Sequence, residues 1–123
     1  MIRALYFSPR SKLQVEYPVD RFKLALRNTK GLLWVDFFSE PNDTCEPIMH
    51  EIFGFHPLAI DDALQETHVP KVDDWGDYLY IVLSALDYDE SLVEGAMHSR
   101  ELDIFLGLNY VVTHHDEPIQ AID

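Results

Sequence analysis

Two apolar runs constrain the fold of this chain most. Residues 32–38 read LLWVDFF, with Asp36 as their one charged member, and residues 78–86 read YLYIVLSAL between charged flanks. Short apolar runs that are bounded by charged or turn-forming residues are typical of buried β-strands. We therefore predict a sheet in which these two segments are inner strands.

Further strands are predicted on both sides of these runs. Residues 2–7 and 13–17 alternate between apolar and polar residues around a turn at 8–11, and residues 100–107 and 110–113 meet at a tight turn. Alternation with a period of two indicates half-buried strands. We expect a hairpin at the N-terminus and an antiparallel meander made of the last three strands.

Three helical segments separate the early strands from the meander. They are predicted at residues 20–28, 42–53 and 57–67, and either Ser39 or Asn42 is expected to cap the second one. Helices between strands, together with hairpins at both ends, predict an α/β sandwich with a mixed sheet. Residues 1–123 are long enough for one domain and too short for two.

The charge of the chain limits the ligands that it can attract. Its net charge is −13, which repels the phosphates of nucleic acid and of anionic lipid and raises the local concentration of cations. A role in keeping the chain soluble, without any cation binding, explains the same negative charge. The N-terminus lacks the pattern of a signal peptide, and no apolar run approaches the roughly 20 residues of a membrane helix, so we expect a soluble polypeptide.

The predicted helix at 57–67 carries the most informative acidic pattern. Pro57 suits its first turn and Pro70 prevents its continuation. At helical spacing one side is apolar, with Ala59, Ile60, Ala63 and Leu64, and the other carries oxygen atoms, with Asp61, Asp62, Gln65 and Glu66. Such a strip suits a hard cation such as Mg²⁺ or Ca²⁺, although two carboxylates hold it only weakly. A solvated helix face with acids near the helix N-terminus explains the same pattern.

The histidines and the single cysteine do not predict a catalytic centre. His50, His56, His68, His114 and His115 lack the spacing of a zinc site, and the last two are expected on opposite faces of their strand. Cys45 is expected to have a raised pKa because acidic residues surround it. Neither a nucleophile elbow nor a glycine-rich phosphate loop occurs, so we predict no enzyme. Asp73 and Asp74 are expected in a turn, and Lys71 is expected to pair with them.

Several motifs together resemble one known family. They are PLAIDDALQ from Pro57, VPKVDDWGDYLYIVL from Val69 and ELDIFLGLNYVVTHHDE from Glu101, preceded by WVDFF from Trp34. This combination resembles the cytoplasmic N-terminal domain of CorA-type magnesium and cobalt transporters. The resemblance covers about residues 32–117.

The resemblance implies both a fold and an assembly. It implies a three-layer α/β/α sandwich that is one lobe of a homopentameric channel at the cytoplasmic face of the cell membrane. In that family the domain continues into stalk and transmembrane helices, so residues 1–123 are expected to be a regulatory domain cut before them. Neighbouring subunits and divalent cations are the expected partners.

The resemblance also implies a regulatory Mg²⁺ site between subunits. The position that matches the family's acidic ligand is Asp62, with Asp61 as its helper, and Co²⁺ is a second candidate ion. Val69 and Asp73 depart from the family, which often has Arg and Glu there. Three alternatives stay open: the zinc-transporting branch, a metal-dependent enzyme that uses both aspartates with His56 or His68, and a module whose acidic face binds a basic partner.

Overall fold

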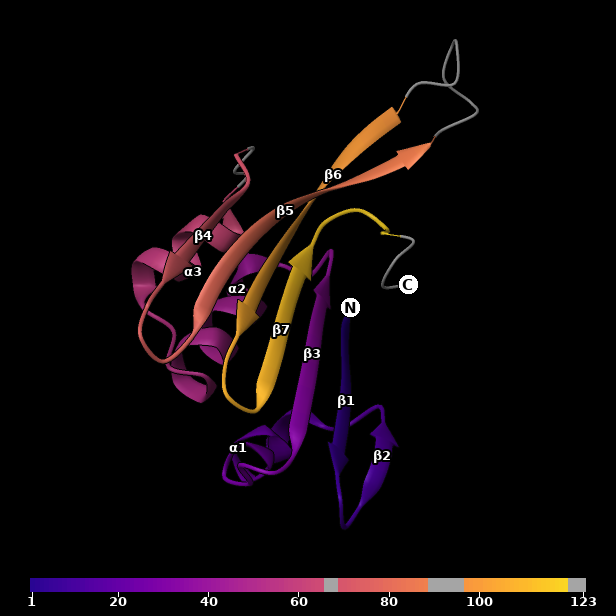
Figure 1. The fold of residues 1–123 in the computed structure, drawn as a ribbon, viewed down its shortest axis with the longest axis vertical. Helices are drawn as coiled ribbons and strands as arrows, with labels where there is room; N and C mark the ends of the chain where they lie inside the picture. The colour runs from indigo at the N-terminus through magenta and orange to yellow at the C-terminus, as the bar shows by residue number, and fades with distance from the viewer. Residues whose placement is uncertain (66–68, 89–96, 120–123) are drawn as a thin grey trace.

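Seven strands form one mixed sheet in the computed structural model, which describes residues 1–65, 69–88 and 97–119 (Figure 1). The strands are β1 (Ile2–Ser8), β2 (Lys12–Val15), β3 (Leu32–Phe38), β4 (Lys71–Asp74), β5 (Leu79–Tyr88), β6 (Met97–Leu106) and β7 (Tyr110–His115). Their order across the sheet is β2-β1-β3-β7-β6-β5-β4. The last strand of the chain therefore lies at the centre of the sheet.

One parallel pair makes the sheet mixed. β3 and β7 run parallel, with Trp34 beside Val111, whereas the other neighbouring strands are antiparallel. The predicted N-terminal hairpin and the predicted meander of β5, β6 and β7 are both confirmed. The α/β class and the mixed sheet are confirmed as well.

The helices lie together behind the sheet in the view of Figure 1. They are α1 (Phe22–Leu26), preceded by the 3₁₀ turn Val19–Arg21; α2 (Asn42–Pro47), which continues as the π-helical turn Ile48–Ile52; and α3 (Pro57–Leu64). They bury Phe22, Met49 and Ile60 in one core with Val35 of β3. The described residues thus form two of the three predicted layers, and the second face of the sheet carries no helix among them.

Aromatic rings fill the core between α3 and the sheet. The ring of Phe55 stacks on Phe105 of β6 at a centroid distance of 4.1 Å and lies 4.8 Å from the ring of Tyr78. Tyr80 of β5 in turn lies 4.9 Å from Phe105. Because these rings are buried, they fix the helix layer on the sheet through apolar burial and ring contacts.

The prediction of a turn at Asp73 and Asp74 is wrong. Lys71–Asp74 forms the edge strand β4, which pairs antiparallel with β5 so that Val72 lies beside Ile81. Charged residues are common on edge strands because they discourage pairing with another chain. Three of the four residues of β4 are charged, so its sequence lacks the apolar alternation that predicts a strand.

The helix boundaries also differ from those predicted. Neither Ser39 nor Asn42 caps α2, because Pro41 holds the N-cap position and Asn42 is the first helical residue. α1 ends at Leu26, two residues before the predicted end. α3 ends at Leu64, and the remainder of its predicted span from residue 66 lies outside the described residues.

Candidate metal site on helix α3

Helix α3 begins at a tightly held junction. Gly54 has a φ of +71°, a backbone conformation that glycine adopts without strain, and it turns the chain into Phe55. His56 is the N-cap residue: its Nδ1 accepts a hydrogen bond from the Leu58 backbone N–H at 3.1 Å, and its own N–H donates to the Tyr78 hydroxyl at 2.9 Å. The first bond closes the helix cap, and the second ties it to Tyr78, the residue that immediately precedes β5.

The two faces of α3 differ as the sequence pattern predicts. Ala59, Ile60 and Ala63 are buried against the core. Asp61 is exposed and Asp62 is half-buried on the outer side of the helix. The apolar side therefore fixes the direction in which the two carboxylates project.

Asp62 already has a cationic partner. The Lys71 Nζ of β4 lies 3.0 Å from Asp62 Oδ2 and 3.1 Å from Asp73 Oδ2. These hydrogen bonds, first to Asp62 and then to Asp73, raise the pKa of Lys71. The predicted pairing of Lys71 with Asp73 is present. Asp74 instead accepts a hydrogen bond from the Gly76 N–H at 2.8 Å.

The donor set on α3 suits a hard cation but is incomplete. Carboxylate oxygens are the ligands that Mg²⁺ prefers, and α3 offers two such side chains. Within residues 1–65, 69–88 and 97–119, no group of three or more His, Cys, Asp or Glu side chains is placed to hold a metal ion. His56 is turned into its own helix cap and stacks on Trp75 at 4.9 Å. His68 and Glu66 lie outside the described residues.

The two adjacent histidines of β7 serve opposite faces of the sheet, as predicted. The Nε2 of His115 lies 3.0 Å from Asp36 Oδ1, whereas the Nδ1 of His114 lies 3.9 Å from Asp103 Oδ2. Both histidines are buried. Each one therefore belongs to a polar cluster of its own, and both clusters are distant in sequence from α3.

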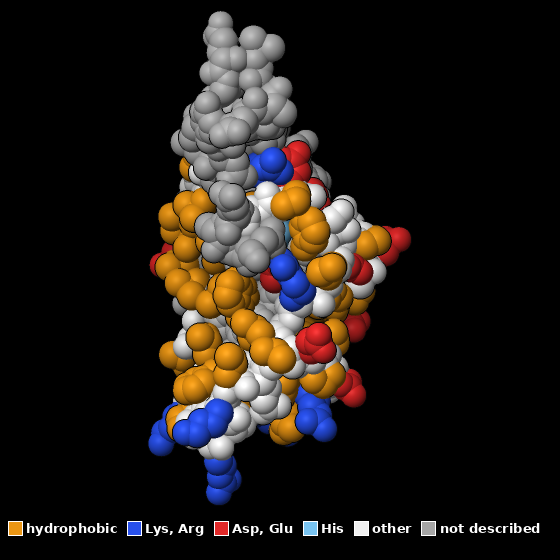
Figure 2. Space-filling model, turned by 90° about the vertical axis from the view of Figure 1, so that its right-hand side faces the viewer, with side chains coloured by type: hydrophobic (Ala, Val, Ile, Leu, Met, Phe, Trp, Pro, Cys, Tyr) orange, Lys and Arg blue, Asp and Glu red, His pale blue; other side chains and the backbone are white. Residues whose placement is uncertain are grey.

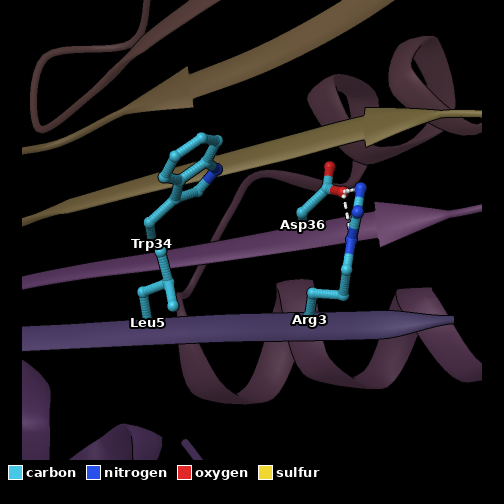
Figure 3. Close-up of a pocket in the computed structure, with 4 residues that line it drawn as sticks. All are labelled: Arg3, Leu5, Trp34 and Asp36. Carbon is cyan, nitrogen blue, oxygen red and sulfur yellow. Dashed lines mark hydrogen bonds and ion pairs between the residues drawn. The ribbon is translucent and has the colours of Figure 1, made fainter. Parts of the chain in front are cut away.

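Asp36 is the centre of the first cluster. Its Oδ1 accepts a hydrogen bond from the Thr113 hydroxyl at 2.7 Å, and its Oδ2 accepts one from Arg3 Nε at 3.2 Å. Trp34 Nε1 donates to the Thr113 oxygen at 3.1 Å. Figure 3 shows Arg3 and Asp36 paired beside the side chains of Leu5 and Trp34. These four residues line a hollow of about 160 Å³.

Asp103 is the centre of the second cluster, on the helix side of the sheet. Its Oδ1 accepts a hydrogen bond from the Tyr80 hydroxyl at 2.9 Å. Burial, followed by repulsion from Glu101, raises the pKa of Asp103 to about 8. Burial also lowers the pKa of His114. At neutral pH this cluster therefore favours a protonated Asp103 and a neutral His114.

The Asp103 cluster predicts a stability that falls with pH. The native protein keeps a proton on Asp103 that the unfolded chain releases near pH 4, so stability declines as pH rises from there to about 8. His114 acts in the opposite direction, but only below about pH 6.5. Between pH 6.5 and 8 we expect a loss of about 2 kcal/mol in the free energy of unfolding. Asp103→Asn should abolish this loss.

Urea unfolding at a series of pH values measures that slope. Asp43→Asn is the matched control, because Asp43 is exposed in the first turn of α2 and the variant should keep the wild-type slope. Equal slopes for the wild type and Asp103→Asn would contradict the assignment.

The Cys45 thiol has the raised pKa that was predicted, but acidic neighbours are not its main cause. Its pKa is raised to about 12, mainly by burial and then by the charge of Glu40. The thiol is completely buried and contacts the Glu40 carbonyl at 3.8 Å. The predicted direction is thus confirmed, with burial as the first cause.

Solved structures with the same fold include transporter domains. The soluble domain of CorA from Methanocaldococcus jannaschii superposes with a TM-score of 0.66 at 20% identity, over 99% of this chain and 43% of that one. The full-length CmaX protein superposes with a TM-score of 0.76 at 15% identity, over 98% of this chain and 36% of that one. At these identities the structures show a shared fold.

Curated relatives match in sequence. YfjQ of Bacillus subtilis (strain 168) is 39% identical over 82 residues, which is 67% of this chain and 24% of that protein. The cobalt/magnesium transport protein CorA of Thermotoga maritima is 28% identical over 94 residues, which is 76% of this chain and 26% of that protein. The matched part of the chain spans about a quarter of the length of these curated relatives.

A family model extends the match from β3 to the end of the chain. The model for the CorA-like Mg²⁺ transporter protein family matches residues 29–123. In the part of the chain that the structure describes, no helix has the length and apolarity needed to cross a bilayer. Because the family model covers more than half of its residues, this chain belongs to the CorA-like Mg²⁺ transporter protein family.

Proposed function

We propose that residues 1–123 are a regulatory domain of a CorA-like divalent-cation transporter and that α3 contributes Asp62, with Asp61 beside it, to a Mg²⁺-sensing site between subunits. Membership of the transporter family supports the general role. The observation that carries the proposed site is the orientation of α3, which buries its alanines and turns both carboxylates outward.

The charges around α3 support a site that is completed by another subunit. Lys71 neutralises part of the charge of Asp62, whereas Asp61 is exposed on the same outer side. A cation must compete with the Lys71 ammonium for Asp62, so we expect weak binding to the isolated domain. Additional oxygen ligands from a neighbouring subunit would complete the set that Mg²⁺ requires.

The proposed gating follows from repulsion between carboxylates. In a homopentamer, Asp61 and Asp62 would face acidic residues of the adjoining subunit and push the two subunits apart. A bound Mg²⁺, or in its place Co²⁺, supplies the positive charge that offsets this repulsion. When the ion is lost, Asp62 would keep only its ion pair with Lys71, and the carboxylates of the two subunits would repel one another again. The contact between subunits would then loosen, which biases the gate toward opening.

The proposal places this domain within a longer protein. The relatives that it matches are about three times as long, and the M. jannaschii soluble domain alone is more than twice as long as this chain. We propose that the whole protein adds stalk and transmembrane helices and that this domain lies at the cytoplasmic face of the cell membrane. Residues 1–123 would sense the ion and would not conduct it.

The proposed role of Asp62 can be tested by limited proteolysis of the full-length protein in detergent over a series of Mg²⁺ concentrations. Asp62→Ala should raise the Mg²⁺ concentration that gives half-maximal protection by about tenfold, equivalent to losing about 1.4 kcal/mol of binding. Asp43→Ala on α2 removes an equal charge from an exposed helix and should leave the midpoint unchanged. An unchanged midpoint for Asp62→Ala would reject its role in sensing.

A further inference from the structure

Lys71 is an isolated positive charge in the middle of the sequence. Between residues 31 and 99 the chain has 15 Asp and Glu residues and a single Lys or Arg, which is Lys71. Six of the nine basic residues lie between Arg10 and Lys30. Figure 2 shows most of the Lys and Arg side chains visible in that view at the lower end of the molecule, where Figure 1 places α1 and the turn between β1 and β2. The one cation of a long acidic stretch therefore lies against Asp62, the carboxylate proposed for Mg²⁺ sensing.

The Lys71 ammonium is held from three sides. Its Nζ donates to Asp62 Oδ2 at 3.0 Å and lies 3.1 Å from Asp73 Oδ2. It also lies 5.6 Å from the centre of the Tyr80 ring, whose face attracts a cation. Asp73 and Tyr80 are directly paired residues of β4 and β5, whereas Asp62 belongs to α3. Lys71 therefore occupies a cation position between the helix and the edge of the sheet.

This position makes Lys71 a competitor of any ion that binds Asp62. A divalent ion beside Asp62 would repel the ammonium twice as strongly as a monovalent ion would at the same distance. The Lys71 side chain is only 32% exposed, so water does not screen this repulsion completely. Binding of the ion therefore requires the ammonium to move away from Asp62.

Asp73 offers the ammonium a place to move to. Its carboxylate already contacts Lys71 from the sheet side, so that ion pair can persist after the contact with Asp62 is broken. Lys71 would then exchange two carboxylate partners for one and would not become an unpaired charge. The exchange requires a movement of one flexible side chain, while the backbones of α3 and β4 can keep their positions.

We propose that Lys71 sets the Mg²⁺ threshold of the sensing site, by holding Asp62 when the ion is absent and moving onto Asp73 when the ion binds. The role of Lys71 rests on the proposed function, because it requires Asp62 to be the sensing carboxylate. It adds two residues that control the affinity of the site in opposite directions. Lys71 weakens the binding of the ion, and Asp73 strengthens it by drawing Lys71 away.

Limited proteolysis of the full-length protein over a series of Mg²⁺ concentrations measures this threshold. Lys71→Gln should lower the concentration for half-maximal protection by about tenfold, because the ion no longer competes with an ammonium. Lys71→Arg keeps the positive charge and should stay within about twofold of the wild type. Lys23→Gln is the matched control, because it removes the same charge from an exposed position on α1 and should leave the midpoint unchanged.

Asp73→Asn tests the place to which the lysine moves. The variant leaves the ammonium to Asp62 alone, so the midpoint should rise by about threefold. A rise is also expected if Asp73 attracts the ion directly, and a double-mutant cycle separates the two causes. If Asp73 acts through Lys71, most of the rise should disappear when Asp73→Asn is made in the Lys71→Gln protein. A rise of full size in that background would overturn the proposed movement.

The outcomes distinguish this role from the proposed function itself. If Asp62→Ala raises the midpoint and Lys71→Gln does not lower it, the sensing site stands and the role of Lys71 is overturned. If Asp62→Ala has no effect, the proposed function fails and the role of Lys71 fails with it. Circular dichroism verifies that the variants fold. Should Lys71→Gln not fold, an unchanged midpoint for Asp73→Asn would still overturn the role of Lys71.

Discussion

Asp36→Ala should lower the free energy of unfolding by about 3 kcal/mol, because one buried carboxylate accepts hydrogen bonds from several donors. Its side chain is 7% exposed and binds the Thr113 hydroxyl, the His115 ring and the Arg3 guanidinium. Alanine removes the acceptor that these three groups share in the middle of the sheet. Urea unfolding monitored by circular dichroism measures the loss.

Two further variants make the result specific to the network. Asp36→Asn keeps an oxygen that can accept from Thr113, so it should cost less than alanine does. Asp61→Ala removes a carboxylate from an exposed position and should change stability by no more than about 0.5 kcal/mol. A cost below about 1 kcal/mol for Asp36→Ala would mean that the network does not stabilise the sheet.

Phe55→Ala should cost about 3–5 kcal/mol of stability, which is the range for removing a buried phenylalanine from a packed core. The ring is 1% exposed and stacks on Phe53 and Phe105, with centroid distances of 5.4 and 4.1 Å. The cavity would lie directly below the start of α3, where His56 donates to Tyr78. The variant should therefore loosen the helix that carries Asp61 and Asp62 in addition to weakening the core.

Hydrogen exchange on the same samples separates the two effects. For each backbone amide, the exchange rate in Phe55→Ala is compared with the rate in the wild type. The increase should be larger in α3 than in β3, because the cavity adjoins the helix. Leu58→Ala, at an exposed position three residues away, should change neither stability nor exchange appreciably. Equal costs for the two variants would show that Phe55 does not fix α3 to the sheet.

Local sequence patterns predicted much of this fold. The strand at Leu32–Phe38 and the start of α3 at Pro57 are confirmed at the predicted residues, since an apolar run and a helix-starting proline act within a few residues of chain. The edge strand Lys71–Asp74 was missed because its pairing with β5, and not its own composition, makes it a strand. The parallel pairing of β3 with β7 likewise joins segments that no local pattern connects.

The polar clusters show a similar limit. Asp36 was evident as a lone charge in a buried strand, and that signal indicates a partner, but its partners Thr113 and His115 lie almost 80 residues further along the chain. The outward direction of Asp61 and Asp62 followed from helical periodicity. The contact between Lys71 and Asp62 did not, because the edge strand that carries Lys71 was not predicted.

The central position of β7 has a consequence for how the chain folds. β2, β1 and β3 form one half of the sheet and β6, β5 and β4 form the other, and only β7 joins them. Both halves can pair locally during synthesis, yet neither acquires its inner neighbour until Tyr110–His115 has left the ribosome. Closure of such a long loop is slow, so the joining of the two halves is the step that should govern the folding rate.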